Sequence, residues 1–283
     1  MAERFGLKDS NYVATPMEPN TNLVIADASH DRPDPKLFRA MVGSIMYAQN
    51  LTQPGVSFAL TQLSRHLASP TQSHMKAAKR VITWLYHHRH LAVSFDGAAD
   101  NTLVGWADAN YAACPDTRRS TGGRLFTCLG GPISWATKMQ RTVATSTAEA
   151  EYMCVSDAAH EALWLRKLMA VLLHLDVDKM PPTEIMEDNR AAQKWCYNPL
   201  NHLKQKHIDV AYHFVREQCT EFQALKGSPI DTDSMLADIG TKALPMPRFE
   251  KLLRTIMNVT DLSLRSNSPT PTLSCPSEGG KSA

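Results

Sequence analysis

Four carboxylates lie where they could converge on one site. Asp108 lies near the carboxyl end of the stretch 103–110, whose first half has the apolar pattern of a buried strand. Glu151, Asp188 and Asp238 each lie at the start or edge of an expected element. Clustered carboxylates repel one another and acquire raised pKa values unless cations lie among them. Two Mg²⁺ ions about 3.5–4 Å apart relieve that repulsion, and they can activate a water and stabilise the leaving oxygen of a phosphodiester. The four acids therefore predict a divalent-metal site in which Asp108 bridges both ions.

Each acid also has an ordinary structural explanation. Acidic residues are favoured in the first turn of a helix, and Asp188-Asn189 could form a turn and a helix cap. Glu149 lies on a different helix face from Glu151, so only one of these two side chains can point at Asp108. Taken together, the order strand end, helix, strand end and helix start favours one acidic cluster over four separate structural roles.

The elements that must position the acids begin with helices. Residues 1–35 are rich in Pro, Asn and Asp and are expected to form an irregular lead-in. Apolar residues with helical spacing predict three helices, over 36–49, over 56–68, and from an N-cap at Ser69 to about residue 90. The apolar faces of these helices need a partner.

After residue 97 the pattern changes to short strands. The expected strands are 103–110, 124–129 and 133–138, with Gly122-Gly123 and Gly130-Gly131-Pro132 as breakers between them. Later elements are a long helix over 146–174, a strand over 183–187, helices over 190–197 and 206–219, a weak strand near 222–230, and helices over 235–244 and 247–257. An antiparallel meander, a long helix and a returning strand predict an α/β fold with a mixed sheet and helices on its faces. In such a sheet Asp108 and Asp188 are neighbours.

The stretch 103–257 resembles the ribonuclease H domain at the end of the Pol polyprotein of copia-type retrotransposons. The matching segments are, in order, GWADANYAACPDTRRSTGG, ISWATKMQRTVATSTAEAEYM, ALWLRKLM, EDNRAA, KHIDVAYHFVRE and LADIGTKAL. Residues 4–95 resemble the carboxyl-terminal part of the reverse transcriptase just upstream, through ERFGLKDSNYVATPM, FRAMVGSIMYA and LTQPGVSFALTQLSRHLASPTQSHMKAAKRVITWL. The Tyr-x-Asp-Asp polymerase motif is absent, so we expect no DNA synthesis.

The resemblance implies a ribonuclease H-like fold, a mixed five-stranded sheet flanked by helices and preceded by a small helical segment. It divides the chain into a helical remnant of the reverse transcriptase (1–97), a ribonuclease H-like domain (98–258) and a disordered tail (259–283). It also implies hydrolysis of the RNA strand of RNA/DNA hybrids with two Mg²⁺ ions, Mn²⁺ being an alternative, and the remainder of a Pol polyprotein as a partner. The family's catalytic and metal-binding positions fall on Asp108, Glu151, Asp188 and Asp238.

Basic residues near these motifs are candidates for holding the phosphates of a hybrid, which proteins read by shape and by 2′-hydroxyls. The candidates are Arg118, Arg119, Lys138 and Arg141, and the alternative for them is a solvated basic turn. A net charge of +2 is too small to indicate a nucleic-acid binder by itself, so any basic surface must be local.

Cysteine spacing and the lack of long apolar runs indicate the expected cellular compartment. Six widely spaced cysteines without a CxxC pair argue against a zinc ribbon or a disulfide scaffold. The amino terminus lacks an apolar core of signal-peptide length, and no run of 18 apolar residues occurs. We therefore expect an intracellular, soluble protein, in the cytoplasm or the nucleus, with no membrane partner.

Two departures from the family pattern favour other interpretations of the chain. Gly240 occupies a position where the family usually has a large apolar residue, and 226–229 interrupt the expected fifth strand. One alternative is a catalytically inactive relic, or a co-opted module that binds hybrids or a protein partner through the helical region 36–90. Another is a related two-metal nuclease that acts on DNA.

Overall fold

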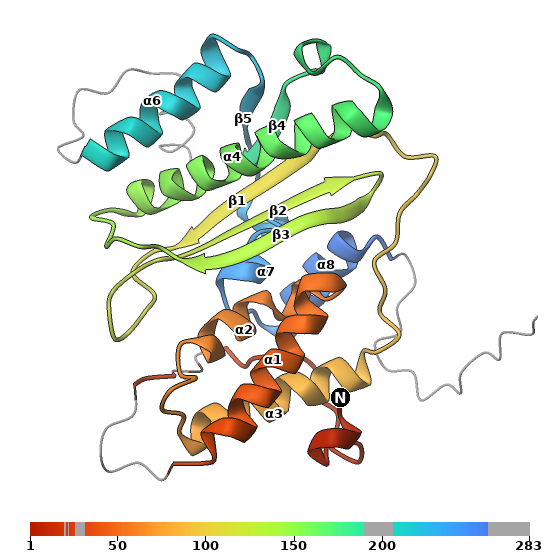
Figure 1. The fold of residues 1–283 in the computed structure, drawn as a ribbon, viewed down its shortest axis with the longest axis vertical. Helices are drawn as coiled ribbons and strands as arrows, with labels where there is room; N and C mark the ends of the chain where they lie inside the picture. Colours follow the sequence, from red (N-terminus) through yellow and green to blue (C-terminus); the bar gives the residue numbers. More distant parts are fainter. Residues whose placement is uncertain (20, 22, 26–31, 190–205, 260–283) are drawn as a thin grey trace, which may run out of the picture.

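A mixed five-stranded sheet forms the centre of the computed structural model (Figure 1), which describes residues 1–19, 21, 23–25, 32–189 and 206–259. The strands are β1 (Val104–Asn110), β2 (Thr121–Cys128), β3 (Gly131–Met139), β4 (Thr183–Glu187) and β5 (Leu225–Pro229), in the spatial order β3-β2-β1-β4-β5. β1, β2 and β3 pair antiparallel, whereas β4 runs parallel to β1 and β5 parallel to β4. This arrangement confirms the predicted ribonuclease H-like sheet.

The described helices lie on both faces of the sheet. They are α1 (Pro35–Leu51), α2 (Ser57–Ser64), α3 (Gln72–His87), α4 (Thr147–Leu173), α6 (Lys206–Thr220), α7 (Asp238–Thr241) and α8 (Met246–Met257). Short 3-10 turns occupy Glu3–Phe5, Pro54–Val56, Val177–Lys179 and Thr232–Ser234. In Figure 1, α4 and α6 lie over one face, and α7, α8 and α1 to α3 lie beyond the other. The predicted helix over 190–197 and the predicted tail from residue 260 lie outside the described residues.

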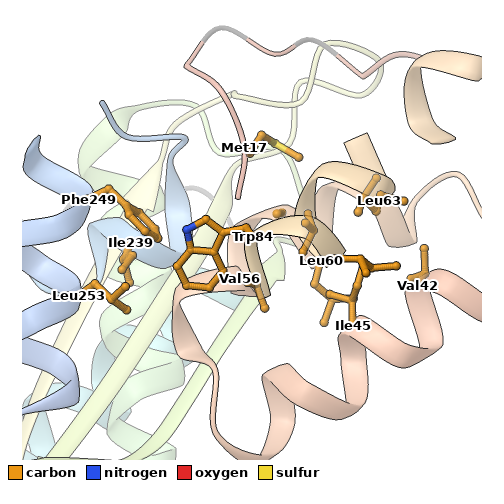
Figure 2. Packing of buried hydrophobic residues seen from close by; sticks show 14 of the residues in the cluster. Met17, Val42, Ile45, Val56, Leu60, Leu63, Trp84, Ile239, Phe249 and Leu253 are labelled. Carbon is orange, nitrogen blue, oxygen red and sulfur yellow. The ribbon is translucent and has the colours of Figure 1, made fainter. Parts of the chain in front are cut away.

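Each face of the sheet has its own core. Alternation along the strands sends Ala107 and Phe126 toward α4, while Trp106 and Leu125 pack on the opposite side. The core on the face opposite α4 is formed by α1, α2 and α3 together with α7 and α8 (Figure 2), and it contains Trp84. The apolar faces of the amino-terminal helices therefore find their partner within this chain. The domain boundary near residue 97 stays a prediction.

Trp84 joins the two groups of helices. Its ring is fully buried, meets Phe249 of α8 edge-on at 5.7 Å between centroids, and stacks on His88. Its indole N–H donates to the carbonyl of Ala14, 3.2 Å away, which ties the amino-terminal segment to the same core. Gly55 is buried beside Trp84, and a Cβ at that position would lie 2.9 Å from Leu253.

Several sequence expectations are wrong in detail. The third helix begins at Gln72 after an N-cap at Thr71, not at Ser69, because Thr71 and His74 form a reciprocal capping box. Gly122 and Gly123 lie inside β2 and do not break it; a Cβ on Gly123 would come within 2.7 Å of Thr241. Their role is close packing, not chain reversal.

The structure accommodates the two departures from the family pattern. β5 pairs with β4 from Leu225 to Pro229, and proline is tolerated there because β5 is an edge strand. The helix expected over 235–244 is reduced to the four residues of α7. A Cβ on Gly240 would lie 2.7 Å from the hydroxyl of Thr137 in β3, so a large side chain would not fit there. Neither position indicates a weakened fold.

Among the described residues, no helix is both long enough and apolar enough to cross a lipid bilayer.

Candidate active site

Asp108 lies near the carboxyl end of β1 with only 1% of its surface exposed. Its strand partner is Gly123, whose missing side chain lets α7 approach the sheet. The hydroxyl of Thr241, at the end of α7, donates a hydrogen bond to Asp108 Oδ2. The carboxylate is therefore held in place from the face of the sheet opposite α4.

Glu151 reaches the same strand end from α4. Ser146 caps this helix by accepting from the Glu149 N–H at 3.1 Å. Glu151 Oε2 accepts the backbone N–H of Ala109 at 2.7 Å, which fixes its carboxylate beside Asp108. The Glu149 carboxylate instead accepts the N–H of Thr145 at 2.8 Å. The expectation that only one of the two glutamates points at Asp108 is confirmed.

Asp188 follows β4 directly, and β4 lies parallel to β1, so the two strand ends are neighbours. One carboxylate oxygen from each of Asp108, Glu151 and Asp188 lies within 4.8 Å of the others. Asp188 Oδ2 also accepts the hydroxyl of Thr232 at 2.9 Å. Three of the four predicted acids are thus brought together by three different segments of the chain.

Asp238 lies beside this group but its carboxylate is already paired. It is fully buried at the start of α7, where Lys242 Nζ lies 2.6 Å from Oδ1 and Arg248 pairs with Oδ2. Lys242 Nζ is also 3.6 Å from Asp108 Oδ1. The fourth acid is therefore linked to the other three through a lysine, an arrangement that the sequence did not predict.

Sequence reasoning also missed Glu187. This residue ends β4 with 1% exposure, on the buried side of a strand whose burial alternates strictly. Its Oε1 accepts the N–H of Asn189 at 2.9 Å, and burial raises the pKa of its carboxyl well above the usual value. An acid at an inward position of a strand was the available signal, but the adjacent Asp188 fitted the strand-end pattern better.

Burial and mutual repulsion disfavour the ionised forms of these acids. Burial, opposed by Lys242 and reinforced by Asp238, raises the pKa of Asp108 to about 7. Burial, with the charges of Glu187 and Asp108, raises the pKa of Glu151 to about 10. Carboxylate oxygens alone are the donor set that hard divalent cations prefer, so the residues present fit Mg²⁺ or Mn²⁺.

These pKa shifts predict that the metal-free protein loses stability as pH rises from 7 to 9. Over that range the folded chain keeps a proton on Glu151 that the unfolded chain releases, so each pH unit costs up to about 1.4 kcal/mol. Asp108, with a pKa of about 7, contributes mainly at the lower end of this range. Urea unfolding in chelator at several pH values measures the slope, and saturating Mg²⁺ is expected to flatten it.

The control for this pH prediction is Glu149→Gln, which leaves the acidic cluster intact and is expected to keep the slope. Glu151→Gln is expected to lower the slope by the share that Glu151 contributes, because glutamine has no proton to lose, whereas the buried Glu187 carboxyl, whose pKa is also raised, keeps its own share. A metal-free wild-type stability that stays level or rises between pH 7 and 9 would contradict the raised pKa values.

Two of the four basic candidates line one groove. Lys138 and Arg141 line a groove of about 580 Å³ beside α4, together with Arg124 and His160. Arg118 and Arg119 lie exposed in the turn between β1 and β2. Contact of any of them with nucleic acid stays a prediction.

Comparisons with known proteins identify relatives of this chain. No protein-family model matches the chain. The retrovirus-related Pol polyprotein from transposon TNT 1-94 of Nicotiana tabacum is 34% identical over 256 residues, which are 88% of this chain and 19% of that polyprotein. The Pol polyprotein from transposon RE2 of Arabidopsis thaliana is 34% identical over 244 residues, 86% of this chain and 16% of its own length. Secreted RxLR effector protein 161 of Plasmopara viticola is 41% identical over 128 residues, 45% of this chain and 90% of that protein.

Among solved structures, the LC11 ribonuclease H1 isolated from compost aligns with 56% of this chain and 96% of its own, at 12% identity and a TM-score of 0.35. The fold class therefore rests on the strand order of this chain and not on that alignment. The order and directions of the five strands define a ribonuclease H-like protein. The chain belongs, more particularly, to the family of the retrovirus-related Pol polyproteins of plant transposons, and it spans less than a fifth of the length of those relatives.

Proposed function

We propose that this chain hydrolyses the RNA strand of RNA/DNA hybrids in the presence of Mg²⁺ or Mn²⁺, as a segment of a Pol polyprotein in the cytoplasm or nucleus. The observation that carries the proposal is the convergence of Asp108, Glu151 and Asp188 within 4.8 Å at the carboxyl end of the central strand. The remainder of the polyprotein is the proposed protein partner.

Asp108, Glu151, Asp188 and Asp238 would hold the divalent ions, the first three lying together and Asp238 being paired with Lys242 and Arg248. Divalent ions bound there supply a water of lowered pKa and stabilise the charge on the phosphodiester during in-line attack. The chain's own part is to fix the donors. Thr241 orients Asp108, the Ala109 N–H orients Glu151 and Thr232 orients Asp188, so each of the three carboxylates has a hydrogen bond that limits its rotation.

Substrate phosphates would be held by the basic residues around the groove beside α4. Lys138 and Arg141 line that groove, whereas Arg118 and Arg119 extend the positive charge to the exposed turn after β1. Neutralised phosphates contribute affinity without reading sequence, which suits a hybrid recognised by its shape.

Two features that favoured an inactive relic have structural explanations. A Cβ on Gly240 would lie close to the Thr137 hydroxyl, and β5 is continuous through Pro229. A buried acidic cluster is costly for a folded protein, and its retention is expected where a cation offsets that cost.

The test is cleavage of a hybrid labelled separately on each strand, beside double-stranded DNA and double-stranded RNA of the same sequence. We expect shortening of the RNA strand of the hybrid alone, dependent on Mg²⁺ and stopped by chelator. Cleavage of the double-stranded DNA at a similar rate would favour the DNA nuclease instead. Binding of the hybrid without cleavage would favour a binding module.

A further inference from the structure

Lys242 carries a positive charge into the middle of the acidic site. It follows Thr241 at the end of α7, four residues after Asp238. Its ammonium lies 2.6 Å from Asp238 Oδ1 and 3.6 Å from Asp108 Oδ1. A third of the lysine side chain is exposed, while the two carboxylates are almost completely buried.

The charges around this ammonium come from several elements of the site. Asp108 belongs to β1, Asp188 follows β4, and Asp238 begins α7. Arg248 of α8 pairs with the second oxygen of Asp238, so that carboxylate has a cation at each oxygen. The Lys242 ammonium, a monovalent cation, therefore already lies near both the Asp108 and the Asp238 carboxylates.

A divalent ion between the same carboxylates would need their oxygens at about 2.0–2.1 Å in near-octahedral geometry. The Asp238 oxygen that lies 2.6 Å from an ammonium already gives a lone pair to that cation, so a divalent ion bound there would place a second cation on the same oxygen. Two cations in one place also repel each other strongly where water is excluded. Because the lysine is partly exposed on a flexible stem, the ammonium can move outward while Arg248 keeps its hold on Asp238.

We propose that Lys242 is a resident counter-ion that competes with a divalent cation for Asp108 and Asp238. The inference rests on the proposed function, because it takes the acidic cluster to be a metal site. It makes Lys242 a positioning residue that keeps the two carboxylates together when no metal is bound and that sets the affinity for the ion they share.

The test is a calorimetric titration of the metal-free chain with Mn²⁺ at one pH and without nucleic acid. We expect Lys242→Met to bind the ion at least tenfold more tightly than the wild type, since the competing charge is gone. Lys242→Arg keeps the charge and is expected to stay within about twofold of the wild type. Lys226→Met is the matched control, because Lys226 also pairs with a carboxylate, Glu184 at 2.7 Å, on the exposed edge of the sheet.

Unchanged or weaker Mn²⁺ binding by a folded Lys242→Met protein would overturn the inference. If that variant loses its folded circular dichroism spectrum, Lys242→Gln takes its place, since glutamine keeps a hydrogen-bond donor without the charge. Unfolding of both neutral variants that Mn²⁺ does not reverse would also overturn the inference.

The outcomes separate this inference from the proposed function. Tighter binding by the neutral variants, together with a wild type that binds Mn²⁺ but cuts no hybrid, would contradict only the proposed function. Hybrid cleavage with unaltered ion affinity in Lys242→Met would contradict only the inference. A wild type that binds no divalent ion would contradict both.

Discussion

Asp108→Asn is expected to slow Mg²⁺-dependent cleavage of the RNA strand by about 10³-fold or more. Asparagine keeps the shape of the side chain but replaces the shared charged ligand with a neutral amide, and much of the rate enhancement in such reactions comes from the charge stabilisation that the ions provide. The variant is expected to fold, because it removes a buried carboxyl whose pKa is raised to about 7. Single-turnover cleavage of a labelled hybrid measures the loss.

Glu149→Gln is the matched control for this loss of activity. Its carboxylate lies on the same helix as that of Glu151 but is engaged by Thr145, away from Asp108. Its cleavage rate is expected to stay within about twofold of the wild type. An Asp108→Asn protein that cuts at the wild-type rate would remove Asp108 from the proposed chemistry.

Trp84→Ala is expected to lower the free energy of unfolding by about 3–5 kcal/mol. The ring is fully buried between the amino-terminal helices and α8, and truncation leaves a cavity against Phe249 and deprives the Ala14 carbonyl of its donor (Figure 2). Since α7 shares this core, the loss is expected to reach the segment that carries Asp238 and Thr241. Urea unfolding followed by tryptophan fluorescence and circular dichroism measures it.

Trp164→Ala provides the comparison, because Trp164 on α4 is 56% exposed and its truncation should cost less than about 1 kcal/mol. Equal destabilisation by the two substitutions would contradict the packing described for Trp84. A wild type that loses its amino-terminal helices in a separate earlier transition would show that the shared core does not couple the two parts.

The acidic strand ends could be predicted because their signals are local. An apolar run that ends in Asp108 and a second that ends next to Asp188 are visible in the sequence, and the order of elements makes those ends neighbours. Glu151 was preferred to Glu149 because of the resemblance, since helix geometry alone shows only that one of the two can point at Asp108. The resemblance to the retrotransposon family pointed to the same positions.

The rest of the site depends on contacts between distant residues. Gly240 and Gly123 look like helix and strand breakers in isolation, and only their approach to Thr137 and Thr241 explains them. The short α7 could not be predicted, because its four residues are held by packing more than by propensity. The pairing of Lys242 with Asp108 joins residues more than 130 positions apart, so no sequence pattern near either one indicates it.

The most direct test of the metal site is a crystal structure of the chain grown with Mn²⁺, in which anomalous scattering locates the ions. We predict two anomalous peaks bridged by Asp108, with Glu151 and Asp188 among the ligands, and Lys242 withdrawn from Asp238. Well-ordered carboxylates with no peak between them at saturating Mn²⁺, or peaks only away from Asp108, would contradict the proposal that this acidic cluster is a two-metal centre.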